Sequence, residues 1–155
     1  MEQYIKKYIK YVLSGLQGTN YPVPYPELDG IGDEYVHLTK TRKKHILRPT
    51  NFIGPNSFTL QRRNLVPVEG YSGILSNYTV TDKADGQRKL LFVSGKGRIY
   101  LISTDMSIAF TGSITRDKTF FNSLVDGEHI IYGKPPESLY INMYACFDLY
   151  FLGGK

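Results

Sequence analysis

The sequence of 155 residues contains no tryptophan, one cysteine and three histidines. The single cysteine, Cys146, excludes an internal disulfide, which fits a reducing compartment. It lies in an apolar stretch, so a buried, inert thiol is a better interpretation than a nucleophile paired with a histidine. The histidines (His37, His45 and His129) are scattered and offer no spacing typical of a zinc site. Neither a disulfide-stabilised scaffold nor a structural zinc site is therefore expected.

Long apolar runs are also missing. No stretch approaches the ~20 residues of a membrane span, and residues 1–13 carry too many charges for a signal peptide. We therefore expect an intracellular protein that is not secreted and has no membrane partner. The glycines of residues 94–98, "SGKGR", lack the spacing of a phosphate-binding P-loop, so a hairpin turn is expected there.

Aromatic residues and positive charge are abundant instead. The 13 tyrosines and 8 phenylalanines favour strands. The net charge of +5 suits a polyanionic partner such as a nucleic acid or a nucleotide, although a basic surface can also serve solubility alone. Composition alone does not decide between these two interpretations of the charge.

The first fifty residues are predicted to form a helix followed by a connector. A helix is predicted within residues 1–20, because apolar side chains recur there at helical spacing, and Gly18 is a plausible end of this helix. These side chains form an apolar stripe that comprises Ile5, Tyr8, Ile9, Val12, Leu13 and Leu16. The lysines off this stripe are expected to be solvated. Residues 21–50 are predicted to be an extended basic connector, because prolines alternate over 22–26. Within it, the alternation over 35–39 predicts a short strand.

The densest positive charge lies in this connector. The basic run comprises Lys40, Arg42, Lys43, Lys44, His45 and Arg48. It is either a solvated loop or a contact with RNA phosphates, made by Lys40, Arg42, Lys43 and Lys44. A single short basic run does not decide between them.

Residues 51–155 are predicted to form one domain built mainly of strands. A short strand is expected through Phe58 and Leu60. Segments 78–84 and 88–94 flank Asp85-Gly86, a pair typical of two-residue hairpins. Further strand-like segments are 97–103, 123–133 and 139–154. Because helix signals are scarce after residue 20, the predicted fold class is α+β, with a mostly antiparallel sheet and the N-terminal amphipathic helix.

Three motifs occur in this domain in a fixed order: K-A-D-G-Q-R over 83–88, V-D-G-E-H-I over 125–130 and Y-A-C-F-D-L-Y-F over 144–151. Each alone has an ordinary explanation, such as a hairpin turn at Asp126-Gly127 or a core aromatic. Together they resemble the covalent nucleotidyltransferases, a superfamily of mRNA capping guanylyltransferases and ATP-dependent DNA and RNA ligases. The upstream segment "IGPNSFTLQRRNL" is similar to capping enzymes of the kind found in large DNA viruses.

The resemblance implies nucleotidyl transfer in two steps through a covalent intermediate. Lys83 is then the nucleophile: it attacks the α-phosphate of GTP, forms a lysyl-N–GMP adduct and passes GMP to the 5′ diphosphate end of an RNA. Its amine must lose a proton, because free lysine has a pKa of about 10.4. The residues implied to bind the nucleotide are Asp85 and Gly86 in the turn, Arg88 at the ribose, Glu128 at the ribose or at Mg²⁺ or Mn²⁺, and Phe147 on the purine.

Later motifs of the family, E/D-G-x-x-x-K and a lysine motif, do not occur before Lys155, and neither does an OB-fold. We therefore expect the N-terminal part of a nucleotidyltransferase domain, incomplete and with little or no activity in isolation. The resemblance also implies fusion or binding to RNA triphosphatase and cap methyltransferase domains, and a location in the cytoplasm (including a viral factory or virion) or the nucleus. Two alternatives stay open: an ATP-dependent DNA or RNA ligase, and a non-catalytic nucleic-acid-binding fragment.

Overall fold

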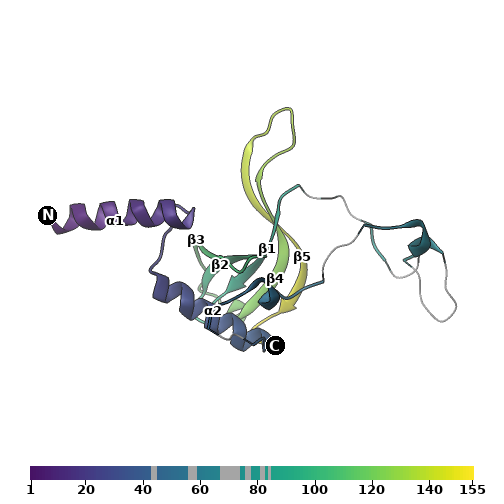
Figure 1. The fold of residues 1–155 in the computed structure, drawn as a ribbon, viewed down its shortest axis with the longest axis horizontal. Coiled ribbons are helices and arrows are strands. Elements are labelled where there is room, and N and C mark those ends of the chain that lie inside the picture. Colours follow the sequence, from purple (N-terminus) through teal and green to yellow (C-terminus); the bar gives the residue numbers. More distant parts are fainter. Residues whose placement is uncertain (43–44, 56–58, 67–73, 76–77, 81–82, 84) are drawn as a thin grey trace. The chain divides into compact units, whose positions relative to one another are not determined.

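A computed structural model of the chain describes all residues except 43–44, 56–58, 67–73, 76–77, 81–82 and 84. The chain divides into two compact units (Figure 1). The first unit joins Met1–Ile53 to Asp85–Lys155, and the second is Gly54–Ala84. Each unit is described separately below.

The first unit contains a five-stranded sheet with the strand order β3-β2-β1-β4-β5. The strands are β1 (Gln87–Val93), β2 (Arg98–Ser103), β3 (Ile108–Ile114), β4 (Ser123–Tyr132) and β5 (Tyr140–Phe151). Neighbouring strands are antiparallel throughout. The turn predicted at residues 94–98 joins β1 to β2, and the 3-10 turns η1 (Pro49–Asn51) and η3 (Lys118–Phe120) lie in the same unit. The structure confirms the predicted α+β class.

The core lies on one face of this sheet, between the strands and helix α2 (Tyr25–Thr39) (Figure 1). Side chains alternate along β1, so Leu90 and Phe92 are both fully buried on the core face. Tyr35 of α2 meets Phe92 edge to face, with ring centroids 6.5 Å apart. The Tyr35 hydroxyl donates to the Asn51 carbonyl at 2.7 Å. Helix α2 thus fixes the strands from which the candidate site projects.

Helix α2 replaces the extended connector predicted within 21–50 and the strand predicted over 35–39, so both of these predictions were wrong. Its buried positions Ile31 and Tyr35 are one turn apart, and the alternation over 35–39 is too short to distinguish a helical period from a strand period. The prolines lie before the helix and in its first turn, where proline is tolerated. The predicted domain boundaries stay a prediction.

Helix α1 (Glu2–Gln17) confirms the predicted N-terminal amphipathic helix. It ends at Gly18, which has a left-handed φ of 60°, as glycine has at many helix ends. The N–H groups of Gly18 and Thr19 both donate to the Ser14 carbonyl. None of the residues of α1 is buried, and its apolar stripe is exposed except at Leu13, which is half-buried. No helix in the described part of the chain is long and apolar enough to cross a membrane.

The second unit contains the 3-10 helix η2 (Arg62–Leu65). The short strand predicted through Leu60 is wrong there, since Leu60 lies in no strand and is exposed, while Phe58 is outside the described residues. The strand predicted over 78–84 is likewise not formed at 78–80, and residues 81–82 and 84 are outside the description. Strand β1 pairs with β2 and β4 instead of forming the predicted hairpin around Asp85-Gly86.

Candidate functional site

Residues of the first two motifs lie on neighbouring strands of the sheet. Arg88 on β1 lies directly opposite Glu128 on β4, and Leu90 lies opposite Asp126. Residues that face one another across an antiparallel pair project from the same side of the sheet. Because Leu90 is a core residue, the side chains of Arg88, Asp126 and Glu128 share the core face. Strand register thus brings Arg88 of the first motif next to the D-G-E motif.

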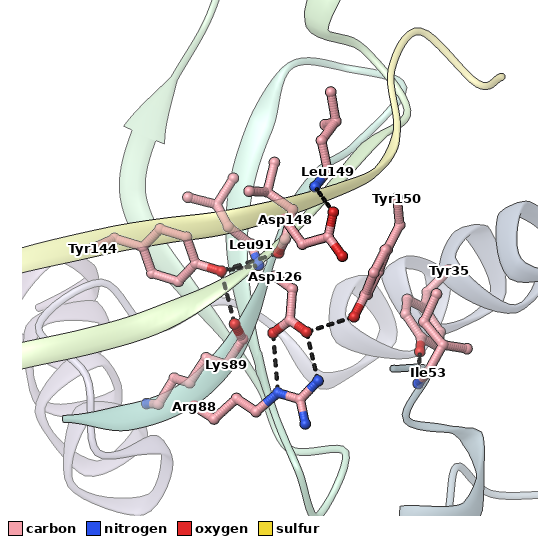
Figure 2. Close-up of polar contacts among 11 residues, drawn as sticks. Tyr35, Ile53, Arg88, Lys89, Leu91, Asp126, Tyr144, Asp148, Leu149 and Tyr150 are labelled. Carbon is pink, nitrogen blue, oxygen red and sulfur yellow. Dashed lines mark hydrogen bonds and ion pairs between the residues drawn. The ribbon is translucent and has the colours of Figure 1, made fainter. Parts of the chain in front are cut away.

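A buried carboxylate holds the guanidinium of Arg88. Asp126 is 1% exposed; its Oδ1 accepts from Arg88 Nε at 3.1 Å and its Oδ2 accepts from Nη2 at 2.5 Å (Figure 2). The Tyr150 hydroxyl donates to the same Oδ2 at 2.6 Å. Arg88 also lies over the Phe52 ring, 5.4 Å from its centroid. The two parallel bonds to Asp126 fix the guanidinium in one orientation.

These contacts also explain how the charge of Asp126 is tolerated inside the protein. The hydrogen bond to Asp126 raises the pKa of Arg88 above its usual value, so Arg88 keeps its charge. Burial raises the pKa of Tyr150 to about 12, and its bond to Asp126 acts in the same direction. Arg88 and Tyr150 together compensate a carboxylate that would be costly to bury alone.

The Asp85-Gly86 segment of the first motif lies against β4. The Gly86 N–H donates to Glu128 Oε1 at 3.3 Å. A Cβ at residue 86 would stand 2.6 Å from the His129 carbonyl oxygen and 3.0 Å from Glu128 Cγ, too close without a shift of the backbone. Glycine is therefore needed for this approach, which keeps residue 86 next to Glu128.

Lys83, the predicted nucleophile, lies in the second unit, and its side chain is exposed. Its chemical role stays a prediction, as do the ribose contacts of Arg88 and Glu128. Lys89, the cation next to Arg88 in sequence, points away from Arg88 because successive strand residues alternate (Figure 2). Burial lowers the pKa of Lys89 below its usual value.

The third motif lies on the edge strand β5. Cys146 lies opposite Gly127 and Asp148 opposite Asp126, so the register skips Phe147, which marks a β-bulge. Phe147 is 59% exposed, so its interpretation as a core aromatic is wrong. Its stacking on a purine stays a prediction. Cys146 is exposed rather than buried as predicted, because its strand is an edge of the sheet.

Asp126-Gly127 does not form the hairpin turn that its sequence allows. Both residues lie inside β4, which pairs with β1 on one side and β5 on the other. The aspartate serves as the partner of Arg88. The glycine leaves space for an aromatic ring, since a Cβ there would stand 2.6 Å from Tyr144 Cζ. The motif therefore lies within a continuous strand, in which Asp126 binds Arg88 and Gly127 leaves room for the Tyr144 ring.

Glu128 is the residue predicted to contribute to binding of a metal ion. Within the described residues, no group of three histidine, cysteine, aspartate or glutamate side chains could hold one. Asp126 is already engaged by Arg88 and Tyr150. Glu128 fits the usual Mg²⁺ pattern, in which one or two carboxylates act together with substrate phosphates. The metal role of Glu128 stays a prediction.

The predicted RNA-binding residues are only partly described. Lys40 follows helix α2 in a left-handed conformation with φ 55°, and it is exposed, as is Arg42. The Arg42 carbonyl accepts a hydrogen bond from Asn51 Nδ2 at 2.9 Å. Lys43 and Lys44 lie outside the described residues. Contact with RNA phosphates stays a prediction.

Sequence reasoning missed Asp126, Tyr144 and Tyr150 as residues of this site. A signal for Asp126 was present, because a carboxylate within an apolar strand needs a cationic partner when it faces the core. Tyr150 is also skipped in the β5 register. A bulge of this kind re-aims a side chain and cannot be recognised from the alternation of apolar and polar residues.

The chain is similar to a known protein family and to a known protein. The family described as "mRNA capping enzyme, catalytic domain" matches residues 26–155. A "Probable mRNA-capping enzyme" of Acanthamoeba polyphaga mimivirus is 31% identical over 139 residues, which are 90% of this chain and 10% of the relative. The chain thus spans about a tenth of the length of that relative. The family match covers most of the chain, so the chain belongs to the catalytic-domain family of the mRNA capping enzymes.

Proposed function

We propose that the chain contributes the nucleophile and nucleotide-binding residues of a GTP:mRNA guanylyltransferase. Family membership supports a role in mRNA capping. The observation that carries the proposal is the pairing of Arg88 with Glu128, because two motifs far apart in sequence place these side chains opposite one another. The Gly86 N–H binds the same glutamate, and Gly86 follows Lys83 closely in the sequence.

The proposed reaction has two steps. In the first, the neutral amine of Lys83 attacks the α-phosphorus of GTP; a P–N bond forms, the bond to the β-phosphate bridging oxygen breaks, pyrophosphate leaves and the amine releases a proton. In the second, a terminal phosphate oxygen of a 5′-diphosphate RNA attacks the same phosphorus, and the P–N bond breaks. The lysine amine is restored by taking up a proton. A covalent intermediate divides one difficult transfer into two easier ones.

The other residues bind and orient the nucleotide. In this proposal, Arg88 donates to the ribose hydroxyls from the orientation that Asp126 fixes. Glu128 accepts from the ribose or holds Mg²⁺ or Mn²⁺; a bound divalent cation would neutralise phosphate charge. The exposed ring of Phe147 stacks on guanine, which is worth ~1–3 kcal/mol.

Labelling of the protein tests the proposal. The intact protein is incubated with Mg²⁺ or Mn²⁺ and GTP labelled at the α-phosphorus, then denatured and examined for attached label. We expect label from α-labelled GTP, but none from α-labelled ATP or from γ-labelled GTP. Label from ATP would indicate a polynucleotide ligase. No label together with retained RNA binding would indicate a non-catalytic module, and either result contradicts the proposal.

The proposed partners are GTP and an RNA whose 5′ end carries a diphosphate. An RNA triphosphatase activity must supply that end, and a methyltransferase acts on the resulting cap, so we propose that both kinds of domain are fused or bound to this chain. The exposed Lys40 and Arg42 are proposed to contact RNA phosphates. The proposed location is the cytoplasm, including a viral factory or virion, or the nucleus.

A further inference from the structure

The hydroxyl of Tyr144 lies between the two strands that carry Arg88 and Glu128. Tyr144 belongs to β5, but its Oη stands 2.7 Å from the Lys89 carbonyl oxygen on β1 and 3.0 Å from the Val125 carbonyl oxygen on β4. It also accepts from the Leu91 N–H at 3.2 Å (Figure 2). One side chain thus reaches across β4 and joins three neighbouring strands through backbone groups.

The ring reaches this position because residue 127 is glycine. A Cβ at Gly127 would stand 2.6 Å from Tyr144 Cζ and 2.7 Å from Cε1. The same Cβ would meet the Ala145 carbonyl oxygen at 2.5 Å. Because Gly127, the central residue of the D-G-E motif, has no side chain, it leaves the space in which Tyr144 of β5 reaches β1. We refer to Tyr144 and Gly127 together as the tyrosine staple.

The hydrogen bonds of the Tyr144 hydroxyl have defined donors and acceptors. A hydroxyl has one proton, so Tyr144 donates to one carbonyl at a time and accepts from the Leu91 N–H. Burial raises the pKa of Tyr144 well above its usual value, so the hydroxyl keeps this proton at neutral pH. Leu91 and Val125 lie directly opposite one another in the register. The hydroxyl therefore bridges opposing backbone groups of β1 and β4.

We propose that Tyr144 is a positioning residue that sets the separation of Arg88 and Glu128 for recognition of the nucleotide ribose. Lys89, whose carbonyl it binds, directly follows Arg88, and Gly127 under its ring directly precedes Glu128. A shift of β1 against β4 therefore changes the separation of the two groups that are proposed to contact the ribose. This inference rests on the proposed function, because it needs a nucleotide at this pair.

Discrimination between ribose and deoxyribose tests the inference. The Tyr144→Phe variant keeps the ring over Gly127 and removes only the hydroxyl. Adduct formation by the intact protein is measured with GTP and with 2′-deoxy-GTP. We expect the ratio of kcat/KM for GTP to that for 2′-deoxy-GTP to fall about three- to tenfold, the size of one hydrogen bond. The Tyr140→Phe variant, on the same strand with an exposed side chain, should leave the ratio unchanged.

A merely structural role gives a different result. If Tyr144 has only a structural role, its substitution lowers the melting temperature and slows adduct formation with GTP and with 2′-deoxy-GTP equally. An unchanged ratio in folded Tyr144→Phe would overturn this inference but not the proposed function. A wild-type protein that forms no adduct with either nucleotide would overturn the proposed function and this inference with it. If Tyr144→Phe does not fold, Gly127→Ala provides the second variant. Because its Cβ excludes the ring, we expect the same fall in the ratio, and an unchanged ratio in folded Gly127→Ala overturns the inference.

Discussion

Replacement of Asp126 by asparagine tests whether the buried ion pair holds the site together. The substitution keeps the size of the side chain but removes its charge. In the Oδ2 position, the amide oxygen can still accept from Arg88 Nη2 and from the Tyr150 hydroxyl. The amide NH₂ group, however, is a donor and cannot accept from the second donor of the Arg88 guanidinium. The arginine then keeps its positive charge but loses the carboxylate that binds it through two hydrogen bonds.

The expected cost follows from the burial of the two partners. Removing one member of a buried ion pair costs about 3–5 kcal/mol. Asp126 is 1% exposed, but the side chain of Arg88 is 25% exposed, so water can compensate part of its charge. We therefore expect Asp126→Asn to lower the free energy of unfolding by about 3 kcal/mol. Tyr150→Phe removes one hydrogen bond to the same carboxylate and should cost about 1.5 kcal/mol.

Urea unfolding of the intact protein at neutral pH measures these values. Glu128→Gln is the matched control, because it makes the same chemical change on the same strand at a more exposed position. We expect it to change the free energy of unfolding by no more than about 0.5 kcal/mol. If Asp126→Asn costs no more than Glu128→Gln, the ion pair does not stabilise the strands, and the reasoning is refuted.

Three further substitutions test separate features. Gly86→Ala places a Cβ 2.6 Å from the His129 carbonyl oxygen. It should slow adduct formation about tenfold to a hundredfold, because a small displacement of reacting groups has an effect of that size. An unchanged rate would show that the close approach of residue 86 to β4 is not needed. Phe147→Ala should weaken GTP binding by ~1–3 kcal/mol if the ring stacks on guanine, whereas Phe147→Tyr should not, as measured by GTP titration. Burial raises the pKa of Tyr35 to about 12, above its unfolded value near 10, so its contribution to stability is complete below about pH 10 and is lost as the pH approaches about 12. Between about pH 10 and about pH 12, the free energy of unfolding should fall about 2–3 kcal/mol less in Tyr35→Phe than in the wild type. An identical fall in wild type and variant would contradict this.

Much of the sheet could be predicted from the sequence because its central strands alternate clearly. Leu90 and Phe92 on β1, and Tyr100 and Ile102 on β2, are all buried at every second position. Residues 25–39 show the limit of such patterns. The prolines of residues 22–26 are compatible with a connector and with the start of a helix, and only the packing of Tyr35 against the sheet decides between the two.

The candidate site could be predicted only in part. The motifs identify Arg88 and Glu128 as important residues, but their pairing depends on which strands become neighbours, and that is a tertiary property. The role of Tyr150 depends on a bulge in β5, which lets it reach Asp126. Long-range contacts of this kind leave no local pattern in the sequence.

The residue that carries the label is the most direct test of the proposed chemistry. The intact protein is labelled with GTP, digested, and its modified peptide is identified by mass spectrometry under conditions that preserve a P–N bond. We predict a GMP group on the amine of Lys83, and no adduct in Lys83→Arg, which keeps the positive charge but cannot act as the same nucleophile. A GMP group on Lys89 or Lys96, or an adduct that persists in Lys83→Arg, would contradict the proposal.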